Sequence, residues 1–111
     1  MNQDPTIARY ESVVDITGQM LAAARNSDWE ALGILEADCA SQVRRLENAE
    51  PGVPMTDAMR LRKCTLIEKI LADDREIRHL TEAWMAQLSS LLSQASARRQ
   101  LSMAYGSHQA V

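Results

Sequence analysis

Apolar residues recur every three or four positions through most of the chain, which is the spacing of one face of an α-helix. The first run follows Asp4, an expected N-cap, and Pro5, which suits the first helical position because it lacks a backbone N–H. This run predicts a helix over residues 4–25. Its seam positions are Ile7, Tyr10, Val14, Thr17, Leu21 and Ala24.

A second run starts at Ser27-Asp28-Trp29-Glu30, an S-x-x-E sequence typical of a capping box. It predicts a helix over residues 28–48 that ends before the segment Glu50-Pro51-Gly52-Val53-Pro54. Because only Asn26 and Ser27 separate the two runs, the first two helices are expected to form an antiparallel hairpin. The apolar stripe of the second helix is Trp29, Leu32, Leu35, Cys39, Val43 and Leu46.

The third run is the longest, and Thr56 is its expected N-cap. No Gly or Pro interrupts it before Gly106, so it predicts a helix over residues 57–97, followed by a short helix over 99–106. Asp73-Asp74 is its weakest point, since residue 74 falls where the seam needs an apolar group, and a kink or break there stays open. The predicted fold class is all-α: an antiparallel helix hairpin packed on a long third helix, with a short C-terminal fourth helix or tail, in a single domain of residues 1–111.

The third predicted helix is about twice as long as each of its partners. At 1.5 Å per residue, about 41 residues reach ~60 Å, whereas about 20 residues reach ~30 Å. The hairpin therefore covers only the first half, and the second half exposes an apolar stripe. Such a patch marks a partner, a second protomer or a segment that folds back, for which residues 101–105 are the candidate. The stripe comprises Ile77, Leu80, Trp84, Met85, Leu88, Leu91 and Leu92.

Charge is distributed unevenly along the 111 residues. The net charge is -3, yet all 15 acidic residues lie at or before Glu82, and only Arg98 and Arg99 are charged after it. This balance disfavours direct binding of nucleic acid. No apolar run approaches the roughly 20 residues of a membrane span, and the first residues lack the layout of a signal peptide. The sequence therefore predicts a cytosolic, cytoplasmic protein without membrane insertion, and Cys39 and Cys64 are expected to be small core residues.

Few residues carry chemistry. Glu76 and His79 have the Glu-x-x-His spacing of bundle di-iron sites, but such a site needs two of these motifs and further carboxylates. A solvent-exposed helix face is the favoured interpretation of this pair. We expect no catalytic residue, no metal and no cofactor, and hence no enzyme. Five methionines are expected either to fill the core or to form an adaptable binding face: Met20, Met55, Met59, Met85 and Met103.

The chain resembles the FliT-type flagellar export chaperones. The resemblance runs from the first helix through Ser27-Asp28-Trp29-Glu30-Ala31-Leu32 to the ending Leu101-Ser102-Met103-Ala104-Tyr105-Gly106, whose Ala-Tyr-Gly is its most specific part. It implies a chaperone of type III protein export that binds the C-terminal helical region of the filament cap protein FliD and prevents its premature assembly. It further implies delivery to the export gate FlhA, contact with the export ATPase complex and, in enteric relatives, restraint of the master regulator FlhDC.

The resemblance also implies roles for individual residues. Client binding falls on the third helix, at Ile70, Ile77, Leu80, Trp84 and Leu88. Tyr105 matches a tyrosine that docks on the export gate, and the terminal segment matches one that folds back and restrains binding. Here that autoinhibitory tail would act through Leu101 and Met103. Two alternatives remain: a structural module that forms a homodimeric helical bundle, and a regulator that acts on transcription through protein contacts.

Overall fold

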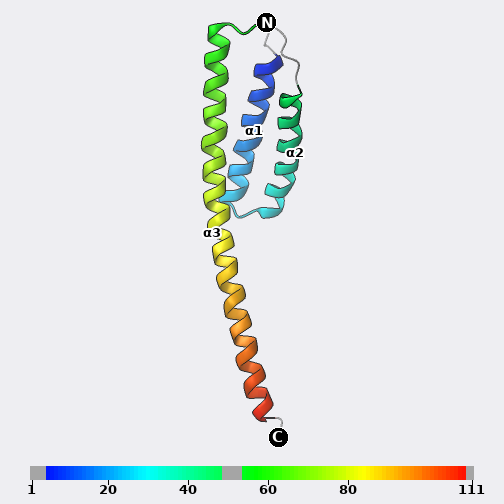
Figure 1. The fold of residues 1–111 in the computed structure, drawn as a ribbon, viewed down its shortest axis with the longest axis vertical. Helices are drawn as coiled ribbons and strands as arrows, with labels where there is room; N and C mark the ends of the chain where they lie inside the picture. The colour runs from blue at the N-terminus through cyan, green and yellow to red at the C-terminus, as the bar shows by residue number, and fades with distance from the viewer. Residues whose placement is uncertain (1–4, 49–53, 110–111) are drawn as a thin grey trace. The chain divides into compact units, whose positions relative to one another are not determined.

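The computed structural model describes residues 5–48 and 54–109 and contains three helices in these ranges: α1 (Pro5–Arg25), α2 (Trp29–Glu47) and α3 (Asp57–Gln109) (Figure 1). No strand occurs in them, and α1 and α2 pack on α3, so the predicted all-α class and helix hairpin are confirmed. The single predicted domain divides by its contacts into two compact units: unit 1 is Met1–Leu80 and unit 2 is Thr81–Val111. The expected N-cap Asp4 and the segment 49–53 lie outside the described residues.

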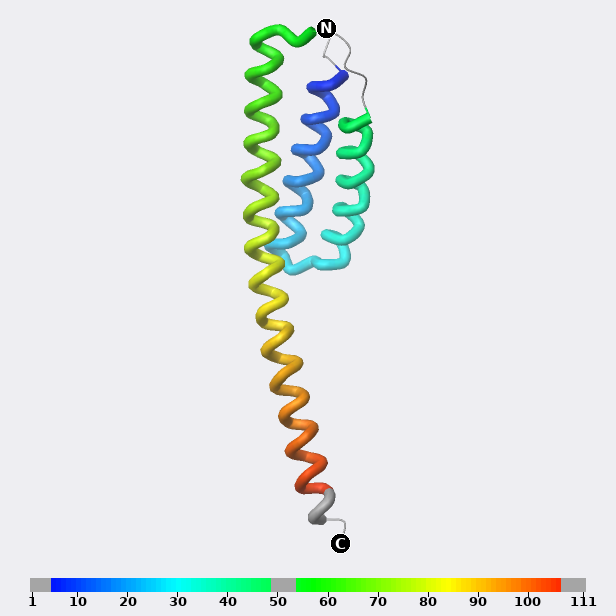
Figure 2. Tube along the Cα trace, viewed as in Figure 1, coloured from blue at the N-terminus to red at the C-terminus, as the bar shows by residue number. Residues whose placement is uncertain are grey.

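The turn between α1 and α2 ends one helix and starts the next (Figure 2). The N–H of Asp28 donates to the carbonyl of Ala23, and the N–H of Ser27 donates to that of Ala24, which is the Schellman pattern. Ser27 takes the left-handed conformation this pattern requires, with φ 57°. The cap of α2 is therefore Asp28, whose carboxylate accepts from the N–H of Ala31 at 3.2 Å, and the predicted capping box of Ser27 and Glu30 is wrong.

Replacing Ser27 with glycine is expected to stabilise the fold. In the left-handed conformation the Cβ atom of Ser27 lies close to a carbonyl oxygen, which destabilises the folded state. Glycine has no Cβ and avoids this steric cost, but its unfolded chain has more conformational entropy to lose on folding, which offsets part of the gain. We expect Ser27→Gly to raise the free energy of unfolding by about 0.5–1 kcal/mol, measured by urea denaturation. Asn26→Gly is the matched control, since Asn26 has no positive φ. If both substitutions change the free energy of unfolding equally, Ser27 does not carry the strain of a left-handed conformation.

The core of unit 1 is built mainly from α1. A cluster of buried residues combines Ile16, Met20, Leu21, Ala23 and Ala24 of α1 with Leu32 of α2 and Ile77 of α3. Two ion pairs join α1 to α3, Glu11 with Arg62 at 3.5 Å and Arg25 with Glu76 at 2.6 Å. Both pairs span 51 positions in sequence, so α1 and α3 run in the same direction, with α2 antiparallel to them.

Helix α3 is longer than predicted. Thr56 caps it, accepting from the N–H of Met59 at 3.2 Å, as the sequence predicts. The helix then passes residue 97 without a break, so the predicted short helix over 99–106 is its last part. The physical reason is that residues 98–105 contain neither Gly nor Pro. Gly106 does not stop the helix, because it lacks the positive φ of a C-capping glycine.

Helix α3 continues through Asp73 and Asp74, and one of the two side chains lies in the core of unit 1. Asp73 is 3% exposed, whereas Asp74 is half-buried, so the core position belongs to Asp73 and the placement of residue 74 in the seam is wrong. Lys69 binds the Oδ1 of Asp73 at 2.7 Å, and Arg78 binds the Oδ2 of Asp74 at 2.9 Å. Both contacts link residues four apart, the spacing that stabilises a helix, and they account for a helix that stays continuous here.

Candidate partner-binding surface

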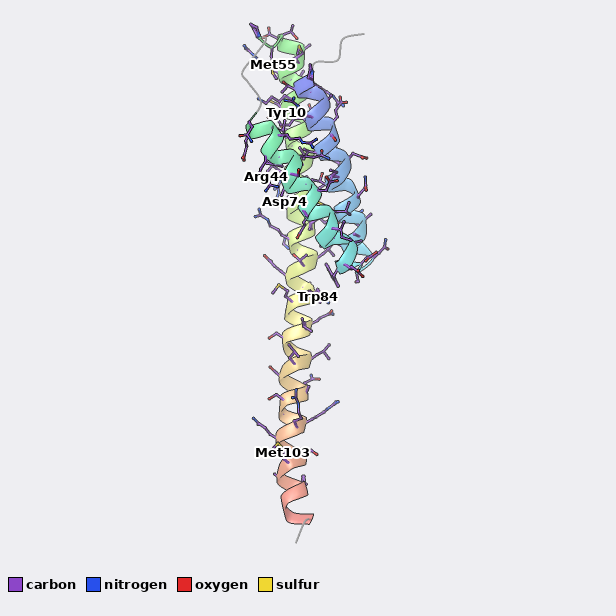
Figure 3. All side chains as sticks on the ribbon, turned by 90° about the vertical axis from the view of Figure 1, so that its right-hand side faces the viewer. Tyr10, Arg44, Met55, Asp74, Trp84 and Met103 are labelled. Atoms are coloured by element: carbon purple, nitrogen blue, oxygen red, sulfur yellow. The ribbon has the colours of Figure 1, made fainter. Side chains whose placement is uncertain are left out.

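Large apolar side chains are exposed along the part of α3 that forms unit 2. We call Trp84, Met85, Leu88, Leu91 and Leu92 the unit 2 stripe. Met85 and Leu91 are each 62% exposed, and Trp84 and Leu88, at 36% and 38%, are the least exposed of the five. Figure 3 labels Trp84 on this part of α3. Exposed apolar patches of this kind are typical of sites that bind another protein.

Small residues between the large ones give this surface its relief. Serines at 89, 93 and 96 leave room beside the leucines, and the side chains border a shallow, open hollow of about 440 Å³. Its lining residues are Met85, Leu88, Ser89, Leu92, Ser93 and Ser96. A partner helix that packs here would therefore find depressions for its own large side chains as well as apolar contact area.

The predicted client-binding residues fall into two environments. Ile77 is 4% exposed and belongs to the core cluster, and Leu80 packs against that cluster. Ile70 is partly buried in unit 1. Only Trp84 and Leu88 lie on the unit 2 stripe. Met85, Leu91 and Leu92 were not among the residues that the resemblance implied, but the apolar stripe predicted from the sequence already contained them.

A second apolar hollow lies within unit 1, where all three helices meet. Its volume is about 300 Å³. Side chains from each helix line it: Tyr10, Val13, Val43, Leu46, Glu47, Ile67, Ile70 and Leu71. The Nζ atom of Lys63 lies 5.5 Å from the centre of the ring of Tyr10, one of the lining residues, which is within cation–π range. Ile70, placed by the resemblance on the client surface, belongs to this hollow.

The C-terminal residues singled out by the sequence are exposed. Leu101, Met103 and Tyr105 lie in the last turns of α3, and each shows more than half of its surface to solvent. Met103 is labelled in Figure 3. Because α3 is continuous here, these side chains do not fold back over the unit 2 stripe in this structure. Tyr105 is accessible to a partner.

The residues considered for metal or thiol chemistry have other surroundings. Glu76 binds Arg25, and His79 is exposed; no group of three potential metal ligands occurs in residues 5–48 and 54–109. Cys39 packs partly against the core, and its burial, with smaller contributions from Asp38, Asp74 and Glu36, raises the pKa of its thiol. Cys64 is exposed, so the expectation that it fills the core is wrong. No described helix is long and apolar enough to cross a bilayer.

Comparisons with known proteins agree on one family. The family of the flagellar protein FliT matches residues 7–107. The flagellar protein FliT of Photorhabdus laumondii is 24% identical over 105 residues, covering 95% of this chain and 84% of the relative. That of Serratia proteamaculans is 25% identical over 108 residues, covering 94% and 85%.

A solved structure gives the same answer for the fold. The crystal structure of flagellar protein FliT from Bordetella bronchiseptica superposes with a TM-score of 0.74 at 34% sequence identity, covering 79% of this chain and 99% of the solved one. The family match covers most of the chain, and the solved relative has a similar fold over the part that superposes. The chain therefore belongs to the FliT family of flagellar export chaperones.

Proposed function

We propose that this chain is the cytosolic chaperone of the filament cap protein FliD, that it binds the C-terminal helical region of FliD and prevents premature assembly, and that it delivers FliD to the export gate FlhA. Membership of the FliT family supports the chaperone role. The observation that carries the client proposal is the unit 2 stripe, which exposes five large apolar residues within nine positions of one helix. These side chains are removed from water only when a partner covers them.

The client binds as an amphipathic helix laid against the stripe, with its own apolar side chains in the hollow beside Leu88. Each large side chain that becomes fully buried contributes about 1.5–3 kcal/mol, before the cost of ordering the client is subtracted. Trp84 and Leu88 are the contacts that carry most of the affinity. Ile77 and Leu80 affect client binding only indirectly, because they pack the first part of α3 into the core of unit 1.

Calorimetric titration of the full chain with the isolated C-terminal region of FliD tests this function directly. A saturable complex supports it. Absence of binding, in a sample whose helical signal is intact, rejects it. If the chain instead forms a dimer whose mass is independent of concentration and ignores the FliD fragment, the alternative of a structural homodimeric module is correct.

The last turns of α3 serve the delivery step. Tyr105 docks on FlhA, and its exposure leaves it available for that contact. Leu101 and Met103 compete with the client for the stripe when the end of α3 unwinds and folds back. The export ATPase complex is a further partner, and restraint of FlhDC is a second role through protein contact. None of these roles uses a catalytic residue or a cofactor.

Truncation after Gln100 separates the two proposed roles of the C-terminal turns. It removes the competing Leu101 and Met103 and the docking Tyr105 but keeps both arginines. We expect affinity for the FliD fragment to rise by about 3- to 10-fold, because the intramolecular competitor is gone, and binding to FlhA to fall below detection. Titration with each partner measures both effects. Unchanged affinity for FliD would remove autoinhibition from the mechanism.

A further inference from the structure

The apolar surface of unit 2 lies between two opposite charges. Residues 83–97 contain no charged side chain; Glu82 precedes this segment and Arg98 and Arg99 follow it. Across 16 residues of helix, the two ends lie about 24 Å apart. The surface therefore has an acidic end and a basic end, with only apolar, amide and hydroxyl side chains between them.

The two arginines lie on the face of the stripe, whereas Glu82 flanks it: three residues turn a helix by about 300°, so Glu82 lies about 60° to one side of Met85. Steps of three and four residues keep one face of a helix, and two such series run through this segment. One series is Glu82, Met85, Leu88, Leu92, Ser96 and Arg99. The other is Trp84, Leu88, Leu91, Ala95 and Arg98. Each arginine thus extends a row of residues that border the exposed apolar surface, and both side chains are exposed.

We propose that unit 2 binds its client in one direction only, as an amphipathic helix whose carboxylates lie beside Arg98 and Arg99 and whose opposite end lies beside Glu82. This rests on the proposed chaperone function and adds the charge pattern of the partner to it. The apolar rows supply affinity, and the charged ends select orientation, because a reversed client would place its carboxylates against Glu82. A helix with acidic residues in its first turn, the arrangement its own dipole favours, enters antiparallel to α3.

The dependence of client affinity on salt tests the proposal. The wild-type chain and the double variant Arg98→Ala, Arg99→Ala are titrated with the C-terminal region of FliD at about 50 and 500 mM salt, conditions between which exposed ion pairs are progressively screened. We expect the variant to bind about 5- to 10-fold more weakly at low salt, and to lose most of the salt dependence seen in the wild type.

Two controls isolate the effect of charge at this place. Arg44→Ala, Arg45→Ala removes another exposed pair of neighbouring arginines, from α2, and is expected to leave the affinity unchanged. Arg98→Lys, Arg99→Lys keeps the charge and is expected to restore most of the affinity. If the lysine variant binds as weakly as the alanine variant, the affinity depends on the shape of the arginine side chains and not on their charge, and the proposal is wrong.

The remaining outcomes are also decisive. Wild-type and alanine variants with the same affinity at both salt concentrations overturn the oriented docking and leave the chaperone function in place. A wild-type chain that does not bind the FliD fragment overturns the proposed function and the inference with it. Sedimentation of the chain alone completes the experiment: if the two arginines control self-association and not client affinity, the occupant is a second copy and the proposal is overturned.

Discussion

Substituting aspartate for Leu88 is expected to lower the affinity for the FliD fragment by at least about 100-fold while leaving the fold intact. Leu88 belongs to both rows of the unit 2 stripe and borders its hollow, so it lies at the centre of the surface that the client covers. Central, desolvated positions of an interface carry most of its energy. A carboxylate there would be buried without a partner when the client binds, which costs several kcal/mol.

The measurement needs a control for the fold and for the loss of any apolar residue. Circular dichroism of the variant is expected to match that of the wild-type chain, because Leu88 is one of the exposed large apolar residues and is not part of the buried core cluster. Ile34→Asp is the matched substitution: Ile34 is 68% exposed on α2 and lies outside the stripe. It is expected to change client affinity by less than about 2-fold. Equal losses in both variants would mean that the client does not use the stripe.

The sequence was sufficient to predict the helices but not the place where the core ends. Apolar spacing, Pro5 and the Thr56 cap predict where α1 and α3 begin, because these signals act within one turn. The rows that contain Ile77, Leu80 and Trp84 continue without a change of period, yet Ile77 is buried and the stripe that begins at Trp84 is exposed. The difference depends on where the hairpin stops beside α3, and that is a property of tertiary packing.

Local signals also failed where two of them competed. Ser27 and Glu30 have the spacing of a capping box, but the chain uses Ser27 for the left-handed end of α1, so Asp28 becomes the cap. Gly106 suggested a helix end, yet a glycine inside a helix costs only about 1 kcal/mol and does not by itself stop it. In each case a neighbouring hydrogen bond or the continuing helix outweighed the residue's usual preference.

Asp73 is an acidic residue that lies buried among the apolar core positions of unit 1. It follows Leu66 and Ile70 and precedes Ile77 in steps of three and four, so its side chain occupies an apolar row. Lys69 binds its Oδ1 at 2.7 Å, but the Oδ2 is buried and has no hydrogen-bond partner among the described residues. On folding, the carboxylate loses its hydrogen bonds to water, and the contact with Lys69 replaces only some of them. The unsatisfied oxygen therefore destabilises the folded state.

Replacing Asp73 with leucine is therefore expected to stabilise unit 1, by about 1–4 kcal/mol in the free energy of unfolding. Leucine restores the apolar row and leaves no carboxylate to desolvate, while Lys69, more than half exposed, returns to solvent. Urea denaturation of the full chain measures the change. Asp74→Leu is the control, because Asp74 is only half-buried and forms a solvent-accessible ion pair with Arg78. This substitution is expected to change the free energy of unfolding by less than about 1 kcal/mol. A loss of stability in Asp73→Leu would show that the carboxylate supports the packing of α3, and that its unpaired oxygen carries little cost.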